Sequence, residues 1–226
     1  MTPPSSSGPR ASRGARTRLA PLPRSFYARP STVVARDLLG RLLIRRRSDV
    51  TLVGRIVECE AYQEGDPASH SFRGLTTRTE VMFGPPGHLY VYFTYGMHFC
   101  ANVVTGRRGE GSAVLLRAVE PLEGIEWMRR RRGVADPQAL CSGPARLTQA
   151  FGIGRPDDGV DLVSGRDLFF SEGRPLVEAQ IGAGPRVGIS VATDRVWRYF
   201  EAGSQFVSRG PSRRARSRGP SGRGGR

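Results

Sequence analysis

The sequence contains no lysine, and all 35 of its basic side chains are arginine. An arginine guanidinium stays protonated near neutral pH and does not act as an amine nucleophile. Catalysis through an imine between a lysine side chain and the substrate is therefore excluded. The N-terminal amine is the group that would have to form such an imine in this chain.

Cysteines and metal-binding patterns are also scarce. The three cysteines, Cys59, Cys100 and Cys141, are odd in number and far apart, as expected for reduced thiols in the cytosol. The chain has no C-x-x-C pair, no H-E-x-x-H motif and no cluster of histidine with cysteine. We therefore expect neither a metal site nor a cofactor.

Long apolar segments are missing as well. No run approaches the ~18 apolar residues of a membrane span. The N-terminus lacks the apolar stretch of a signal peptide. We expect a cytoplasmic, nucleoid-associated bacterial protein that is a monomer and has no membrane partner.

Positive charge is abundant but unevenly distributed. The 35 arginines and 20 acidic residues give a formal charge of +15, yet residues 25–208 carry only +3. Residues 1–24 and 209–226 contain arginine, glycine, proline and serine but no acid, which predicts disordered basic tails around one domain at 25–208. Such tails can contact phosphates, or they can reflect the composition of a GC-rich genome. Composition alone leaves both explanations open.

Short strands and helices are mixed irregularly along the central segment. Helices are predicted at 31–39, 121–132 and 143–151, and strands at 41–46, 52–61, 112–119, 167–171, 185–191 and 196–207. Two further β-prone runs within 89–102 predict a hairpin. Because the elements do not alternate as βαβ units, we expect an α+β single domain with a curved, mainly antiparallel β-sheet, a protruding β-hairpin and surrounding short helices.

Two glutamates share the second predicted strand. Its period of two puts Ile56, Glu58, Glu60 and Tyr62 on one face, with the Cα atoms of the glutamates roughly 6.6 Å apart. Paired carboxylates occur in sugar hydrolases, but those pairs usually face each other from different elements. We favour one functional or structural carboxylate and a second one paired with an arginine.

The predicted hairpin is rich in aromatic residues. Tyr90, Tyr92, Tyr95 and Phe99 lie within ten residues, and Tyr95 lies at the tip. An exposed aromatic tip suits a wedge that enters a base stack, whereas a buried aromatic cluster would serve only packing. The residues themselves leave both interpretations open.

Several long motifs together resemble one known family. They are Ile56-Val-Glu-Cys-Glu-Ala-Tyr62, Ala68-Ser-His70, Leu89-Tyr-Val-Tyr-Phe-Thr-Tyr-Gly-Met-His-Phe-Cys-Ala-Asn102, Val114-Leu-Leu-Arg-Ala-Val-Glu-Pro121 and Leu140-Cys-Ser-Gly-Pro144. Their order and spacing are similar to those of the alkyladenine (3-methyladenine) DNA glycosylase family across residues 25–208. The resemblance implies an enzyme that flips a damaged purine out of duplex DNA and hydrolyses its N-glycosidic bond.

The resemblance also implies a role for each matched residue. Glu60 corresponds to the general base, and Arg117 and the backbone carbonyl of Val187 to the groups that help hold the attacking water. The residues that correspond to the base-binding pocket are Tyr62, His70 and Tyr92, as aromatic walls, and Asn102, which disfavours normal guanine. Tyr95 corresponds to the wedge, with Met97 and His98 beside it at the DNA surface.

The implied activity is that of a monofunctional hydrolase, because no lysine is present to support strand cleavage. Its substrate would be double-stranded DNA that contains alkylated or deaminated purines. One alternative is a non-catalytic DNA-binding or architectural protein on the same fold, which would need neither Glu60 nor Arg117. A carbohydrate hydrolase fits less well, because the chain has only two tryptophans, Trp127 and Trp197, and no acidic cluster.

The position of Asn102 constrains the hairpin turn. If residues 95–96 formed a two-residue turn, Tyr92 would pair with Phe99, so Tyr92 and Asn102 would face opposite sides. The resemblance requires both side chains in one pocket. We therefore predict a three-residue connection or a bulge near residues 95–97.

Overall fold

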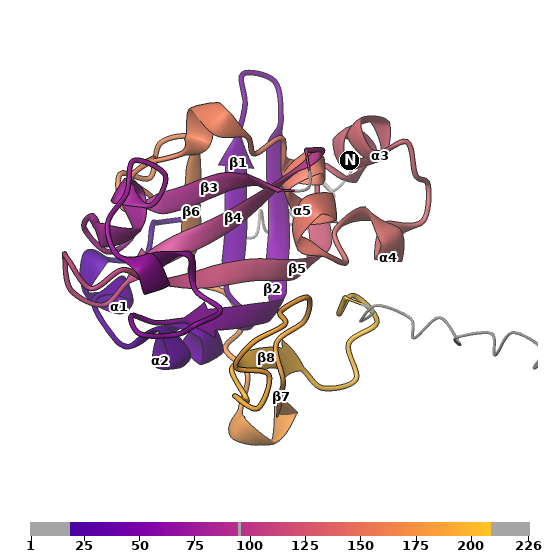
Figure 1. Ribbon diagram of the computed structural model, residues 1–226. Helices are drawn as coiled ribbons and strands as arrows, with labels where there is room; N and C mark the ends of the chain where they lie inside the picture. Colours follow the sequence, from indigo (N-terminus) through magenta and orange to yellow (C-terminus); the bar gives the residue numbers. More distant parts are fainter. Residues whose placement is uncertain (1–18, 95, 209–226) are drawn as a thin grey trace, which may run out of the picture.

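The computed structural model describes residues 19–94 and 96–208. Figure 1 shows a curved sheet with short helices around it. The strands are β1 (Leu42–Arg46), β2 (Thr51–Tyr62), β3 (Leu89–Thr94), β4 (His98–Thr105), β5 (Ser112–Glu123), β6 (Leu168–Ser171), β7 (Ile181–Gly184) and β8 (Arg198–Glu201). The α-helices are α1 (Arg24–Tyr27), α2 (Ser31–Asp37), α3 (Ile125–Arg132), α4 (Pro137–Leu140) and α5 (Pro144–Phe151). Four short 3-10 helices are η1 (His70–Arg73), η2 (Glu80–Phe83), η3 (Arg155–Asp157) and η4 (Glu178–Gln180).

Within the described residues, eight strands form one sheet. Six of them follow the order β3-β4-β5-β2-β1-β6, while β8 pairs with β2 and β7 pairs with β8. Every strand pair is antiparallel. Strand β2 is the centre of the sheet, because it pairs with β5 on one side and with both β1 and β8 on the other. In Figure 1, β7 and β8 extend below the main sheet. The predicted fold class, an α+β single domain with a mainly antiparallel sheet, is confirmed.

The two faces of the sheet have different environments. On one face, Cys59 and Ala61 of β2 and Leu116 of β5 join the main hydrophobic core. Side chains of α2 and α5, among them Val34 and Phe151, belong to the same core. The alternate residues of these strands point to the other face, which holds the charged and aromatic side chains described below.

A bulge in β2 changes the predicted face of one residue. Ile56 pairs with Val119, but Glu58 already pairs with Ala118, so one extra residue, Val57, lies between them. Ile56 consequently lies in the core cluster with Cys59. Strict alternation placed Ile56 on the face of Glu58, and that prediction is wrong.

The hairpin has the predicted three-residue connection. Thr94 pairs with His98, so residues 95–97 link β3 to β4. Gly96 has a φ of +65°, a conformation that glycine adopts without steric cost. Tyr92 therefore pairs with Cys100, and Asn102 falls on the same face as Tyr92.

Three predicted elements differ from the structure. Residues 121–123 continue β5 through the pairing of Glu123 with Val53, and the helix begins only at Ile125. The predicted strand at 185–191 is absent from the part of the chain that the structure describes, because the backbone N–H of Val187 bonds a carboxylate instead of a neighbouring strand. The predicted strand at 196–207 is limited to Arg198–Glu201.

The packed domain begins before residue 25. Pro21 forms a β-bridge with Ser171, and the backbone N–H of Leu22 donates to the carbonyl of Phe170 over 2.8 Å. The Leu22 side chain is only 1% exposed. Residues 21–24 therefore belong to the domain rather than to the N-terminal tail.

We expect Leu22→Ala to lower the free energy of unfolding by about 2–4 kcal/mol, because it removes a buried side chain and leaves a cavity. Leu122, which is 43% exposed, provides the control, and Leu122→Ala should cost less than about 1 kcal/mol. Urea denaturation of the full chain measures both. Equal effects would show that the segment before residue 25 is not integral to the core.

Candidate active site

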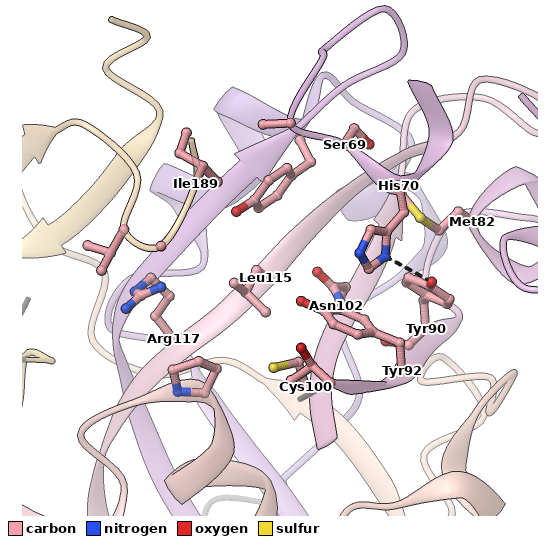
Figure 2. Close-up of a pocket in the computed structure, with 16 residues that line it drawn as sticks. Ser69, His70, Met82, Tyr90, Tyr92, Cys100, Asn102, Leu115, Arg117 and Ile189 are labelled. Atoms are coloured by element: carbon pink, nitrogen blue, oxygen red, sulfur yellow. Dashed lines mark hydrogen bonds between the residues drawn. The ribbon is translucent and has the colours of Figure 1, made fainter. Parts of the chain in front are cut away.

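A cavity of about 360 Å³ lies on the sheet face opposite the core. It is lined by strand residues of β2 to β5 and by loop residues around positions 68–70 and 187–189. The lining residues are Tyr62, Ala68, Ser69, His70, Met82, Tyr90, Tyr92, Thr94, Cys100, Asn102, Leu115, Arg117, Pro144, Val187, Gly188 and Ile189. In Figure 2, His70, Tyr90 and Tyr92 gather on one side, with Arg117 and Ile189 on the other.

Three aromatic rings form one wall of this cavity. The rings of His70 and Tyr92 meet edge to face with centroids 4.4 Å apart. Tyr90 packs 5.6 Å from Tyr92, and its hydroxyl lies 3.1 Å from His70 Nδ1 (Figure 2). His70 is held at the start of η1, where the Ser69 hydroxyl accepts from the N–H of Ser71. The structure therefore brings the predicted residues His70 and Tyr92 into contact, and Tyr62, the third predicted aromatic residue, lines the same cavity.

Arg78 affects the charge state of this wall. Its guanidinium lies 5.9 Å from the Tyr92 ring centroid. The pKa of His70 is lowered, first by partial burial of the ring and second by the positive charge of Arg78. His70 is therefore neutral at neutral pH and presents an uncharged ring to the cavity.

Glu60 lies directly behind the cavity lining, with a side chain that is 0% exposed. Its carboxylate accepts from the Val187 N–H over 2.7 Å and from the Tyr62 hydroxyl over 3.0 Å. The Nη1 atom of Arg117 lies 3.2 Å from Glu60 Oε1. All three partners line the cavity, so they lie between Glu60 and the cavity space.

The environment of Glu60 affects its protonation. Burial raises the pKa of Glu60, while Arg117, the Val187 N–H and the Tyr62 hydroxyl oppose that rise. Burial alone would lower the pKa of Arg117, but Glu60 and Glu58 outweigh it and raise that pKa. The arrangement therefore holds a permanent cation beside a carboxylate whose proton affinity is increased, as in many acid–base sites.

Val187 contacts Glu60 through its N–H, whereas the sequence resemblance implied a role for its carbonyl.

Arg186, the residue before Val187, anchors the loop that contains Val187. Arg186 forms a fully buried ion pair with Asp66 and donates to the carbonyl of Ala61 over 3.1 Å. Its guanidinium also lies 4.6 Å from the ring centroid of Tyr62.

The Asp66–Arg186 pair is a positioning feature that the sequence analysis missed. Asp66 also accepts from the N–H of Ala68, so the pair joins the loop before His70 to the loop that contains Val187. The two residues are 120 positions apart, and no local pattern connects them. Tyr90 and Cys100 were missed as lining residues, although each lies two positions from a predicted pocket residue on the same strand face.

Asn102 lines the cavity, and the residue as a whole is only 5% exposed. Its Nδ2 atom donates to the carbonyl of Tyr90 over 3.3 Å, which fixes the amide on its partner strand. At the end of the hairpin, Met97 is 70% exposed and His98 is also exposed. Tyr95, the predicted wedge, lies outside the residues that the structure describes.

Within residues 19–94 and 96–208, no group of three histidine, cysteine, aspartate or glutamate side chains could hold a metal ion. In the same ranges, no helix is both long and apolar enough to span a membrane. Cys59, Cys100 and Cys141 are buried free thiols.

Comparison with known proteins gives a consistent match. A family model described as methylpurine-DNA glycosylase matches residues 25–205. A relative from Carboxydothermus hydrogenoformans is 48% identical over 188 residues, which cover 83% of this chain and 98% of the relative. One from Methanoculleus marisnigri is 52% identical, with 83% and 98% covered, and one from Burkholderia lata is 50% identical, with 86% and 94% covered. All three are provisionally named 3-methyladenine DNA glycosylases.

Removing the positive charge beside His70 should raise its pKa. We expect Arg78→Ala to shift the His70 titration to higher pH, because Arg78 disfavours the imidazolium. An NMR titration of the three histidines in the chain measures the change. Arg73→Ala, which changes an exposed arginine at the end of η1, is the matched control and should leave the His70 titration unchanged. An unshifted titration in Arg78→Ala would contradict this electrostatic account.

Proposed function

The chain belongs to the methylpurine-DNA glycosylase family, and from that premise we propose that it flips a damaged purine out of duplex DNA and hydrolyses its N-glycosidic bond with a water activated by Glu60. A DNA glycosylase is a hydrolase, and its reaction leaves an abasic site. The observation that carries the proposal is the buried Glu60 carboxylate behind an aromatic cavity, beside Arg117.

The cavity suits a flipped base in size and surface. Its volume of about 360 Å³ is within the range of small-molecule sites. Alkylation at N3 or N7 makes a purine cationic, and a cation against an aromatic face gains about 0.5–2 kcal/mol. A neutral His70 does not repel such a base. These features support Tyr62, His70 and Tyr92 as the walls that hold it.

The proposed reaction requires little acid catalysis from the protein. A cationic purine is already a good leaving group, so the enzyme needs chiefly a positioned water and stabilisation of an oxocarbenium-like sugar. We assign Glu60 as the general base, and Arg117 with the Val187 carbonyl as the groups that position the water. The negative charge of Glu60 would also stabilise positive charge that develops on the sugar.

Base selection and extrusion are assigned to further residues. Asn102 would oppose the exocyclic amine of normal guanine, which favours alkylated and deaminated purines. Tyr95 would fill the space left by the extruded nucleotide, with Met97 and His98 beside it at the DNA surface. Extrusion costs a few kcal/mol and costs least at a damaged pair, which adds selectivity.

We further propose that the protein acts as a monomer on DNA in the bacterial cytoplasm, at the nucleoid. The arginines of segments 1–18 and 209–226 would contact phosphates while the domain reads one flipped base. Such contacts are independent of sequence and support movement along DNA during the search for rare lesions.

A non-catalytic DNA-binding protein on this fold is the main alternative. It would need no carboxylate buried beside a cation, since such a pair is costly to bury and contributes nothing to phosphate contacts. A sugar hydrolase is disfavoured because Glu58 and Glu60 are both bound to one guanidinium instead of facing each other across the cavity.

We expect Glu60→Gln to lower the single-turnover rate of base release by at least ~100-fold, because it removes the general base. The assay uses a duplex with one 7-methylguanine, followed by alkaline cleavage at the abasic site. Binding to the same duplex, measured by fluorescence anisotropy, should persist. Glu64→Gln, which changes an exposed glutamate near the same strand, should retain the normal rate. A normal rate in Glu60→Gln would remove Glu60 as the base.

The enzyme should have no lyase activity, because the chain lacks a lysine that could form an imine at the sugar. Incubation with lesion DNA and borohydride should trap no covalent protein–DNA adduct, and strands should break only after alkali. A lysine-dependent glycosylase-lyase treated in parallel is the positive control. A trapped adduct would overturn the monofunctional assignment, and its loss after N-terminal acetylation would identify the terminal amine as the nucleophile.

A further inference from the structure

Glu58 is a buried charge that the proposed mechanism does not use. Its side chain is 0% exposed, and it does not line the base cavity. It nevertheless accepts four hydrogen bonds: from Arg117 Nε over 3.1 Å, from Arg198 Nε over 2.6 Å, and from the N–H and hydroxyl of Ser208 over 2.6 and 2.9 Å. A carboxylate bound this completely is fixed in one orientation.

Ser208 connects the two sides of this network. Its hydroxyl donates to Glu58 and accepts from Arg117 Nη2 over 3.1 Å. Three nitrogens of the Arg117 guanidinium are therefore directed: Nε to Glu58, Nη2 to Ser208, and Nη1 to Glu60. Because the guanidinium is planar and rigid, holding the first two nitrogens determines where the third one lies.

We propose that Glu58 and Ser208 are positioning residues that orient Arg117 toward Glu60, so that Ser208 completes the active site. The inference rests on the proposed roles of Glu60 and Arg117. Ser208 comes from the C-terminal end of the domain, 150 positions from Glu58. The catalytic centre is thus complete only when Ser208 is docked against Glu58 of β2 and Arg117 of β5.

Charge gives the network a second effect. The groups that face Glu60 are Arg117 from β5, Glu58 and Tyr62 from β2, the Val187 N–H from its loop, and the Cys100 thiol from β4. The groups that face Glu58 are Arg117, Arg198 of β8, Ser208 and Glu60, while the Cys59 thiol lies near both carboxylates on the opposite face of β2. Among the charged neighbours of Glu60, Glu58 raises its pKa and Arg117 lowers it. Neutralising Glu58 would by itself lower the pH at which Glu60 becomes ionised, whereas displacing Arg117 would raise it.

A structural role alone would have different consequences. If Glu58 and Ser208 served only to bury charge, their replacement would change stability while leaving the ratio of rate to binding unaltered. A positioning role predicts that catalysis falls while DNA binding persists, since a small displacement of a catalytic group slows chemistry more than it weakens binding.

The first test replaces Ser208 in the full chain. Ser208→Ala should lower the single-turnover rate on a saturated duplex with one 7-methylguanine by about 10-fold, with unchanged affinity for that duplex. Ser204→Ala is the matched control, because the Ser204 hydroxyl accepts from the Phe206 N–H in the same segment and does not contact Glu58. It should keep the normal rate. A normal rate in Ser208→Ala would overturn the proposal.

The second test measures the pH dependence of Glu58→Gln. Loss of the Glu58 charge alone would move the acid-side midpoint of the pH–rate profile to lower pH, whereas displacement of Arg117 from Glu60 should move it to higher pH, because Arg117 lowers the pKa of Glu60 more than Glu58 raises it. The positioning role therefore predicts a midpoint at higher pH than that of the parent enzyme, and a midpoint that is unchanged or lower would contradict it. If Glu58→Gln fails to fold, the comparison of Ser208→Ala with Ser204→Ala decides alone. Full activity in Glu60→Gln would instead defeat the proposed function. An inactive Glu60→Gln together with a fully active Ser208→Ala would defeat only this inference.

Discussion

The burial of two carboxylates on the central strand constrains the whole arrangement around β2. Glu58 and Glu60 are both 0% exposed, and an unpaired charge in such a position would cost several kcal/mol. The compensating cations are Arg117 from β5 and Arg198 from β8. These two strands flank β2 on opposite sides at this point, so the sheet order itself brings the cations to the carboxylates.

Separation of the two sheet faces follows from the same constraint. Cys59 and Ala61 enter the core while Glu58 and Glu60 turn away from it, so one strand serves packing and chemistry at once. The bulge at Val57 makes it possible for Ile56 to lie in the core although Glu58 lies on the other face, because without the bulge Ile56 would share the face of Glu58. Slippage by one residue in this strand would exchange the two environments completely.

Much of this organisation was predictable from the sequence. Period-two patterns located β2 and the hairpin, and the requirement that Tyr92 and Asn102 share a face predicted the three-residue connection. The bulge in β2 was not predictable, because it arises from pairing with β5 rather than from the residues of β2. Neither was the Asp66–Arg186 pair, since a contact between distant loops leaves no local pattern. The segment 185–191 looked like a strand, but its Val187 N–H is used by Glu60.

The balance of charge bears on how the proposed reaction would be favoured. Two carboxylates face two guanidinium groups, and Asp66 pairs with both Arg186 and Arg195, so these seven groups carry one net positive charge. Attraction of a cationic base would then depend on the aromatic wall and on a neutral His70 rather than on a general negative potential. During bond cleavage, positive charge passes from the base to the sugar. A fixed carboxylate at this position would stabilise the later charge distribution more than the earlier one, which is the requirement for catalysis.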